Sequence, residues 1–407
     1  MRDDLGIEPE WKVQQRLWGH PFHPMCSYLA SFPAALAHAF VARYTRPGDV
    51  VLDPFCGRGT TPLQGCVEGR IGVGNDLNPL AHVLTAAKME PPTSRALDAR
   101  LSSLRIDWSL EAPAWLELAG RVVTGKPHAA LALVPAAGSG LGPRGGSEPV
   151  PAEVTLAFHP GTLAQVLFAR ARLRLDDPAD RFLAAGLAGI LHGKRPGYLS
   201  ELMPNAFSMA PRYARDYAAR TSFVAPDRDL FVLLAAKLRR LARDGRPGTT
   251  GIALLGDARD AGLRARAALR DRALPDRARL VLTSPPYLRV LKYGYYNWLR
   301  AWYLGFSAAE IDATLDDAHR RENDDLRRDS RHAGAVFEQL WKSASPIPPG
   351  TSASSAIAAG WTLGQGRVFV FGNDLLFRAQ PHGNFKFFFN AMYLSVAPTM
   401  KAGAGGN

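Results

Sequence analysis

The sequence predicts an α/β fold in which a parallel sheet is interrupted by a largely helical insertion. Short apolar runs that end in glycine, aspartate or proline turns occur in two blocks, one before residue 95 and one after residue 251. Such runs are typical of strands buried in a parallel sheet. Residues 96–250 lie between the blocks and show mainly helical spacing of apolar side chains. A chain of 407 residues that is 47% hydrophobic is long enough to bury at least one large core.

The first block opens with a helix and a buried strand. Ser31 and Pro33 can start the helix. The turn Arg46-Pro47-Gly48-Asp49 then leads into Val50-Val51-Leu52, a run short and apolar enough for a buried parallel strand. The apolar positions that we expect on one face of the helix are Leu36, Phe40, Val41 and Tyr44.

A glycine-rich loop follows this strand. It reads Asp53-Pro54-Phe55-Cys56-Gly57-Arg58-Gly59-Thr60-Thr61 and leads into a helix that ends near Gly69. A second strand, Ile71–Gly74, is closed by Asn75-Asp76, and Pro79 starts another helix. The order of strand, glycine loop, helix, strand and acid is typical of the first βαβ unit of a Rossmann-like fold.

The insertion differs in composition from the block before it. Residues 123–152 are rich in Gly, Pro, Ala and Ser and predict a flexible linker or a surface excursion. Residues 153–247 predict helices. The α/β pattern resumes at Ile252–Asp257 and again at Leu280–Thr283, so both blocks are expected to build one sheet.

The C-terminal third is harder to interpret. Gly366–Gly372 predicts a late strand of the same sheet, but Ser343–Gly360 is low-complexity where a packed helix would be expected. No pattern can be assigned from Asp374 onward. We therefore expect an α/β domain whose first part covers residues 1–95, an insertion at 96–250, the rest of the domain at 251–373, and an unassigned tail at 374–407.

The glycine loop suits an adenosine ligand with an amino-acid tail. Gly57 and Gly59 permit a tight turn with backbone N–H groups close to a ligand, ahead of a helix N-terminus that favours a carboxylate. The third glycine of the dinucleotide fingerprint is missing, and Asp53 would repel a pyrophosphate but suits an ammonium group. Asp76 can accept hydrogen bonds from ribose hydroxyls, and Asp257 from the adenine amino group. A glycine-rich turn with a capping aspartate is the structural alternative.

The tetrad Ser284-Pro285-Pro286-Tyr287 suits a base with an exocyclic amine. The lone pair of such an amine is delocalised into the ring, and two acceptors on its N–H groups make the nitrogen a better nucleophile. Ser284 Oγ and the Pro285 carbonyl can be these acceptors, and the two prolines hold the loop rigid. Tyr287 can stack on a base taken out of the helix. The alternative is a proline turn after a strand. No Pro-Cys dipeptide occurs, so the cysteine nucleophile of carbon methylation is missing.

Together these motifs resemble the amino-methyltransferases of bacterial restriction–modification systems, which modify N4 of cytosine or N6 of adenine in DNA. The resemblance covers about residues 20–90 and 250–306. It implies S-adenosyl-L-methionine as cofactor, a cofactor loop of the form Asp-Pro-Phe-x-Gly-x-Gly-Thr, a segment that touches the methionine end, and a catalytic tetrad. Serine at the first tetrad position is usual in cytosine-N4 members. The positions that match these motifs are Phe32 and Pro33; Asp53, Phe55, Gly57, Gly59 and Thr60; and Ser284, Pro285, Pro286 and Tyr287.

The resemblance also implies partners, namely DNA and a cognate restriction endonuclease. A net charge of +12 agrees with a partner that carries phosphates. Arginine supplies most of the basic residues, which suits phosphate and guanine contacts, although a genome-wide codon bias explains it equally well. The insertion carries basic and aromatic residues that predict a part in target recognition. They include Arg212, Tyr213, Arg215 and Tyr217.

Composition also restricts the compartment and the chemistry. Three cysteines without a CxxC pair argue against a disulfide framework or a zinc ribbon. His20-Pro21-Phe22-His23 has no matched acid or cysteine nearby, so no metal site is expected. No apolar signal region or membrane-spanning run occurs, and we expect a cytoplasmic protein. An adenine-N6 enzyme, an RNA methyltransferase and a non-catalytic nucleic-acid-binding relative remain open as alternatives.

Overall fold

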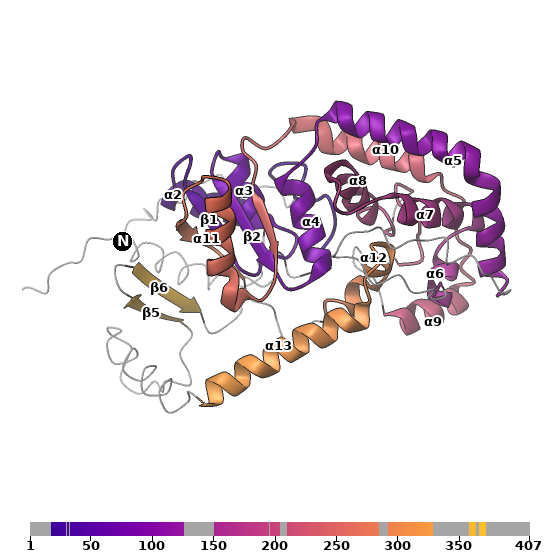
Figure 1. Cartoon of the computed structure of the whole chain (residues 1–407). Helices are drawn as coiled ribbons and strands as arrows, with labels where there is room; N and C mark the ends of the chain where they lie inside the picture. Colours follow the sequence, from indigo (N-terminus) through magenta and orange to yellow (C-terminus); the bar gives the residue numbers. More distant parts are fainter. Residues whose placement is uncertain are drawn as a thin grey trace, which may run out of the picture. The chain divides into compact units, whose positions relative to one another are not determined.

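The computed structural model of the chain describes residues 18–29, 31, 33–125, 150–194, 196–203, 210–284, 292–328, 358–363 and 366–371. Figure 1 shows these residues in colour. The chain divides into two compact units. One, called here the larger unit, is Val13–His319, and the other is Met1–Lys12 together with Arg320–Asn407. Among the described helices, none combines the length and the apolar character that a membrane crossing requires.

A parallel four-stranded sheet forms the centre of the predicted α/β domain. Its strands are β1 (Val50–Asp53), β2 (Ile71–Asp76), β3 (Ile252–Leu255) and β4 (Ala278–Val281), in the order β3-β2-β1-β4. Every neighbouring pair is parallel. Strand β4 ends two residues before the predicted Thr283, yet the Leu282 N–H still donates to the Leu52 carbonyl at 3.0 Å. The predicted fold class is therefore confirmed, with strands from both sequence blocks in one sheet.

Helices cover both faces of this sheet. On one face α11 (Ala261–Asp271) packs Ala265 and Leu269 against Val50 and Leu52 of β1. On the other face α3 (Thr60–Val67) lies very close to β2, because a Cβ at Gly72 would stand 2.0 Å from the Pro62 carbonyl oxygen. Helices α2 (Ala34–Tyr44) and α4 (Pro79–Met89) flank α3, and a 3-10 turn, η3 (Ala258–Asp260), precedes α11.

The insertion folds into a group of helices, here called the helical body (Figure 1). Its helices share the core that includes Phe168 and Phe182. The side chains of Thr93, Asp177 and Asp229 cap their N-termini by accepting backbone N–H groups. The helical prediction for residues 153–247 is confirmed. The helical body comprises α5 (Ser94–Val123), α6 (Ala152–Ala157), α7 (Pro160–Arg172), α8 (Pro178–Ala188), α9 (Pro211–Thr221), α10 (Leu230–Leu241) and the 3-10 turn η2 (Ala242–Asp244).

One helix from the second sequence block packs on the helical body. This is α12 (Trp298–Tyr303), which follows the 3-10 turn η4 (Tyr295–Asn297) and precedes α13 (Ala308–Arg328). The buried Arg300 donates from Nε to the Ala188 carbonyl at the end of α8, at 3.1 Å. In return, Arg170 of α7 donates from Nε to the Trp302 carbonyl at 3.0 Å. The chain downstream of the tetrad is thus held by the helical body.

The late strand predicted at Gly366–Gly372 exists, but the prediction that it extends the main sheet was wrong. Strand β6 (Gly366–Phe371) pairs antiparallel with β5 (Ala358–Leu363) in a separate two-stranded sheet. Only two residues, 364 and 365, separate the two strands in the sequence. The divisions proposed at residues 95, 250 and 373 stay predictions.

Candidate functional site

The parallel sheet brings the carboxyl ends of its four strands to one edge. Asp53 and Asp76 end β1 and β2, while Asp257 and Ser284 follow β3 and β4. Strands β2 and β3 lie on one side of β1 and β4 lies on the other, so the strand order reverses between β1 and β4. Ligands of open α/β sheets bind in the crevice at such a switch point. The glycine loop and Ser284 flank it.

Two residues of the glycine loop require glycine. Gly57 and Gly59 have φ angles of 51° and 77°, in the left-handed region that glycine tolerates. A Cβ at Gly59 would lie 2.7 Å from Thr85 Oγ1, and the same hydroxyl donates to the Gly57 carbonyl at 3.0 Å. Thr60 then begins α3 directly behind the loop. Backbone N–H groups at this turn and at the start of α3 are thereby held at the switch point.

Asp76 ties the loop to the end of β2. Its Oδ2 accepts the Gly57 N–H at 2.8 Å and its Oδ1 accepts the Asn78 N–H at 2.9 Å. Burial raises the pKa of this carboxyl to about 6, although the backbone hydrogen bonds oppose the shift. A carboxylate that accepts two N–H groups retains lone pairs for further donors such as hydroxyls.

Asp53 lies deeper, beneath the loop, with 2% of its surface exposed. Its Oδ1 accepts the Phe55 N–H at 3.1 Å. Burial raises the pKa of this carboxyl to about 7, and the Asp76 charge adds to the shift. The hydroxyls of Thr61 and Thr283 are near enough to lower that pKa, but neither closes a hydrogen bond of normal geometry with it. An ammonium group beside Asp53 would restore its charge.

Several buried polar atoms at this edge have no hydrogen-bond partner among the residues that the structure describes. An unsatisfied buried polar group costs about 1–3 kcal/mol, so such atoms point to a missing polar ligand. A nucleoside with a zwitterionic tail offers the donors and acceptors that they need, and we conclude that the edge fits S-adenosylmethionine. The atoms are Oγ1 of Thr60, Thr61 and Thr283 and Oδ1 of Asn75.

Asp257 has a competing role. Its carboxylate accepts the Arg259 backbone N–H at 3.0 Å and forms an ion pair with the Arg259 guanidinium at 2.7 Å. An adenine amino group would have to share this carboxylate with Arg259. Pro33 is exposed at the start of α2, and Ser284 is half-buried. Four predicted site residues lie outside the described residues: Phe32, Pro285, Pro286 and Tyr287.

Comparison with known proteins shows a family similarity for the first part of this site. Residues 8–82 match the sequence model of N6_N4_Mtase, described as DNA methylase. This stretch is therefore similar to the N6/N4 DNA methylases. It contains the glycine loop and Asp76 but neither Asp257 nor the tetrad. The resemblance drawn from the motifs is confirmed over this stretch.

Two type II methyltransferases show distant similarity to this chain. M.MjaII of Methanocaldococcus jannaschii is 32% identical over 96 residues, which are 22% of this chain and 18% of that protein. M.XycI of Xanthomonas campestris pv. cyanopsidis is 37% identical over 71 residues, 17% of this chain and 24% of that protein. The chain thus spans about a quarter or less of the length of either relative. No solved structure matches it significantly.

Two residues of the candidate site were missed by sequence reasoning. Tyr28 packs its ring against Gly57, where a Cβ would lie 3.3 Å from Tyr28 Cε1, and it belongs to no motif. Lys88 is 1% exposed and donates from Nζ to the Arg58 carbonyl of the loop. Burial lowers the pKa of Lys88 to about 7, and the Arg58 charge adds to the shift. A lysine on the buried face of an otherwise apolar helix was the signal that could have revealed it.

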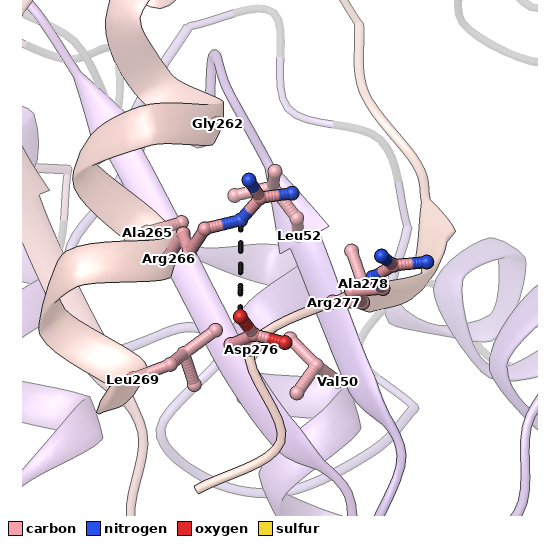
Figure 2. A pocket seen from close by; sticks show the side chains of 9 residues that line it. All are labelled: Val50, Leu52, Gly262, Ala265, Arg266, Leu269, Asp276, Arg277 and Ala278. Carbon is pink, nitrogen blue, oxygen red and sulfur yellow. Dashed lines mark ion pairs between the residues drawn. The ribbon is translucent and has the colours of Figure 1, made fainter.

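A cavity of about 270 Å³ lies elsewhere on the four-stranded sheet. Figure 2 shows its apolar lining from β1 and α11, with the Arg266 and Asp276 side chains 3.9 Å apart across it. Its lining includes Val50 and Ala278, where β1 and β4 begin, and none of the predicted site residues lines it. We therefore place the candidate site at the carboxyl edge and not in this cavity.

Proposed function

We propose that the chain is a DNA methyltransferase that transfers a methyl group from S-adenosylmethionine to an exocyclic amine of a base. Cytosine N4 is the first expectation and adenine N6 the second. The observation that carries the proposal is that the glycine loop and Ser284 follow neighbouring parallel strands, β1 and β4, on the two sides of the switch point. The match of residues 8–82 to the DNA methylase family supports it.

The acidic residues and the loop would hold the cofactor. Asp76 would accept hydrogen bonds from the ribose hydroxyls, and Asp53 would face the ammonium group. The N–H groups at the start of α3 would receive the carboxylate, because the Gly57 and Gly59 N–H groups already donate to Asp76 Oδ2 and to the Cys56 carbonyl. Asp257 would accept the adenine amino group. The bound cofactor supplies an electrophilic methyl group on its sulfonium.

The tetrad would prepare the nucleophile. Ser284 Oγ and the Pro285 carbonyl would accept hydrogen bonds from the amine and so localise its lone pair. Tyr287 would stack on the extruded base. Because the displacement is direct, the residues mainly have to fix the amine in line with the methyl group. The serine at position 284 is the feature that favours cytosine over adenine.

The proposed partners follow from charge and family. A chain with a net charge of +12 is expected to bind DNA through its phosphates, and the helical body would take part in target recognition. A cognate restriction endonuclease is the proposed protein partner, by analogy with the type II methyltransferases that the chain resembles.

The test is a methyl-transfer assay with product analysis. Purified protein is incubated with methyl-labelled S-adenosylmethionine and DNA from a host strain that lacks this gene, and the nucleosides are identified by mass spectrometry. Labelled 4-methylcytosine is expected, and labelled 6-methyladenine would assign the second choice. Cofactor binding without label in DNA would overturn the proposal, and label in RNA alone would redirect it to RNA.

Variants connect the activity to the tetrad. Ser284→Ala and Tyr287→Ala should bind cofactor normally and lose methyl transfer, because their proposed contacts are to the base. Ser109→Ala is the matched control, since the Ser109 hydroxyl donates to its own helix at the Ile106 carbonyl and is exposed. Wild-type single-turnover rates in either tetrad variant would show that the active site lies elsewhere.

A further inference from the structure

Tyr28 contacts three parts of the candidate site at once. Its ring packs against Gly57 of the glycine loop. Its hydroxyl accepts a hydrogen bond from Asn78 Nδ2 at 3.0 Å. Its ring also stacks on Tyr293, with 6.1 Å between ring centroids and 24° between ring planes. The loop after β1, the turn after β2 and the chain after the tetrad therefore meet at one side chain.

The contact with Asn78 leads directly to Asp76. Asn78 is buried, its N–H donates to Asp76 Oδ1 at 2.9 Å, and its own Oδ1 accepts the Leu80 N–H that begins α4. Both oxygens of Asp76 are thus bound to residues that contact Tyr28, since Oδ2 accepts the Gly57 N–H. A ligand that binds Asp76 and the loop therefore contacts residues that themselves contact Tyr28.

On its other side, Tyr293 is firmly anchored. It is 7% exposed, and its carbonyl accepts Asn297 Nδ2 at 2.9 Å. The next two N–H groups, of Gly294 and Tyr295, donate to the two carboxylate oxygens of Asp312 on α13 at 2.7 and 2.9 Å. Tyr293 is therefore held in place six residues after the tetrad in the sequence, and β4 is held in the sheet before it.

The chemistry of Tyr28 suits a permanent neutral contact. Burial and the Asp76 charge raise the pKa of its phenol well above the ordinary value, so the hydroxyl stays protonated at physiological pH. A neutral, rigid aromatic ring loses little conformational freedom when it is held between two surfaces. It can pass a displacement of the loop to the stacked ring without a change of charge.

We propose that Tyr28 is the positioning residue through which cofactor binding and target-base binding strengthen each other. Cofactor at Asp76 and the glycine loop holds Tyr28, and Tyr28 holds Tyr293 in the chain that follows the tetrad, so both ligands act on the same packed contact. By linkage, DNA must tighten cofactor binding by the same factor. This inference rests on the proposed function.

The experiment measures that factor by calorimetry on the full chain. S-adenosylhomocysteine, which has no methyl group to transfer, is titrated with and without sheared DNA from a host strain that lacks this gene. We expect DNA to tighten its binding by a factor within the usual allosteric range of about 5–150-fold. In Tyr28→Ala and in Tyr293→Ala the factor should fall to nearly one, and the double variant should lose no more than either single variant.

Matched variants separate coupling from folding. Tyr28→Phe keeps the stacked ring and should retain the coupling factor. If Tyr28→Ala fails to fold, Tyr28→Leu replaces it, because leucine keeps the bulk of the side chain but cannot stack. Phe40→Ala is the control, because Phe40 stacks on Tyr44 at 6.0 Å and 28° outside the site.

Two outcomes overturn the inference: a wild-type chain whose cofactor affinity is unchanged by DNA, or folded Tyr28→Leu and Tyr293→Ala variants that keep the wild-type factor. Methyl transfer by the wild type is scored separately. An active enzyme without coupling would refute the role of Tyr28 alone, whereas an inactive chain would refute the proposed function.

Discussion

Three ionisable side chains beneath the glycine loop are buried deeply enough to titrate near neutral pH. Burial raises the pKa of Asp53 to about 7 and that of Asp76 to about 6, and it lowers the pKa of Lys88 to about 7. Each group therefore changes charge in a pH range where the same group in the unfolded chain does not. The stability and the cofactor affinity of this region should both depend on pH.

For Asp53 the expected sign is a loss of stability as pH rises. The unfolded carboxyl loses its proton near pH 3.8, whereas the folded one keeps it to about pH 7, so the folded chain binds more protons between these values. This group then lowers the unfolding free energy by at most about 1.4 kcal/mol per pH unit across that window. Asp53→Asn should flatten the dependence, measured by denaturant unfolding at pH 5 and pH 8. Exposed Asp98→Asn is the control, and equal slopes in wild type and Asp53→Asn would contradict the assignment.

Cofactor affinity should change in the opposite direction with pH. A ligand ammonium beside Asp53 binds the ionised carboxylate, so affinity for S-adenosylmethionine should rise up to tenfold per pH unit below about pH 7 and level off above it. Asp53→Asn should remove this dependence and weaken binding at pH 8. Calorimetry between pH 5.5 and 8 measures both effects, and an unchanged affinity profile in the folded variant would exclude Asp53 as the ammonium partner.

A substitution at Lys88 can separate an effect on folding stability from an effect on cofactor binding. Its ammonium holds the Arg58 carbonyl, yet its charge is costly to bury. Lys88→Met should therefore leave the unfolding free energy at pH 6 equal or higher while weakening cofactor binding several-fold, because the loop loses its anchor. Chemical denaturation and calorimetry on the same preparation test this. A variant with lower stability and normal affinity would assign Lys88 to the core alone.

At the scale of elements, the junction between the glycine loop and α3 is the most constrained backbone of the site. Gly59→Ala would force an alanine to φ 77° and place its Cβ 2.7 Å from Thr85 Oγ1. The left-handed conformation alone costs about 1–2 kcal/mol, and the close approach to Thr85 adds to it. We expect a lower melting temperature and weakened cofactor binding.

The same substitution at Gly120 is the matched control. Gly120 lies within α5, and a Cβ there would meet nothing within 4 Å. Gly120→Ala should stabilise the chain by about 0.5–1 kcal/mol, since alanine is the better helix former. If both alanine variants behaved alike in thermal unfolding, the special geometry of Gly59 would be refuted.

Elements whose sequence carries a local signal were predicted well. Val50-Val51-Leu52 lies in a buried strand, Ile252–Leu255 forms a strand of which Ile252 is buried, and Pro79 marks the start of α4, as predicted. The pairing of β6 was missed because partner choice depends on the neighbouring strand β5, which a low-complexity composition concealed. Tyr28 and Tyr293 could not be predicted either, because a ring contact across more than 260 positions leaves no local pattern.

At the scale of the whole molecule, positive charge should govern the encounter with DNA. Helix α9 exposes Arg212 and Arg220 on the helical body, while Arg215 forms an ion pair with Glu153 at 3.2 Å. Replacing Arg212 and Arg220 by alanine should weaken DNA binding at low salt. It should also reduce the slope of log affinity against log salt by about one for each phosphate that the protein no longer neutralises.

A surface arginine away from α9 provides the comparison. Arg174 is exposed and pairs with Asp176 at 2.9 Å, so Arg174→Ala should keep the wild-type salt slope. Fluorescence anisotropy with labelled duplex at several salt concentrations measures all slopes. A wild-type slope in the α9 variant would remove this helix from the DNA-binding surface.

The attachment of α12 to the helical body has a consequence for how such a chain can be recombined. Arg300 donates a hydrogen bond to the Ala188 carbonyl, and Arg170 donates one to the Trp302 carbonyl. Residues 96–250 and α12 therefore have to be exchanged together, although more than forty residues separate them in the sequence. A chimaera that exchanges only residues 96–250 with a relative would pair a foreign scaffold with a resident helix. A crossover that carries the segment up to Phe306 as well should yield soluble protein. An exchange of target specificity that keeps the resident strands β3 and β4 would then require two exchanged segments. Two breakpoints would lie before these strands and two after them.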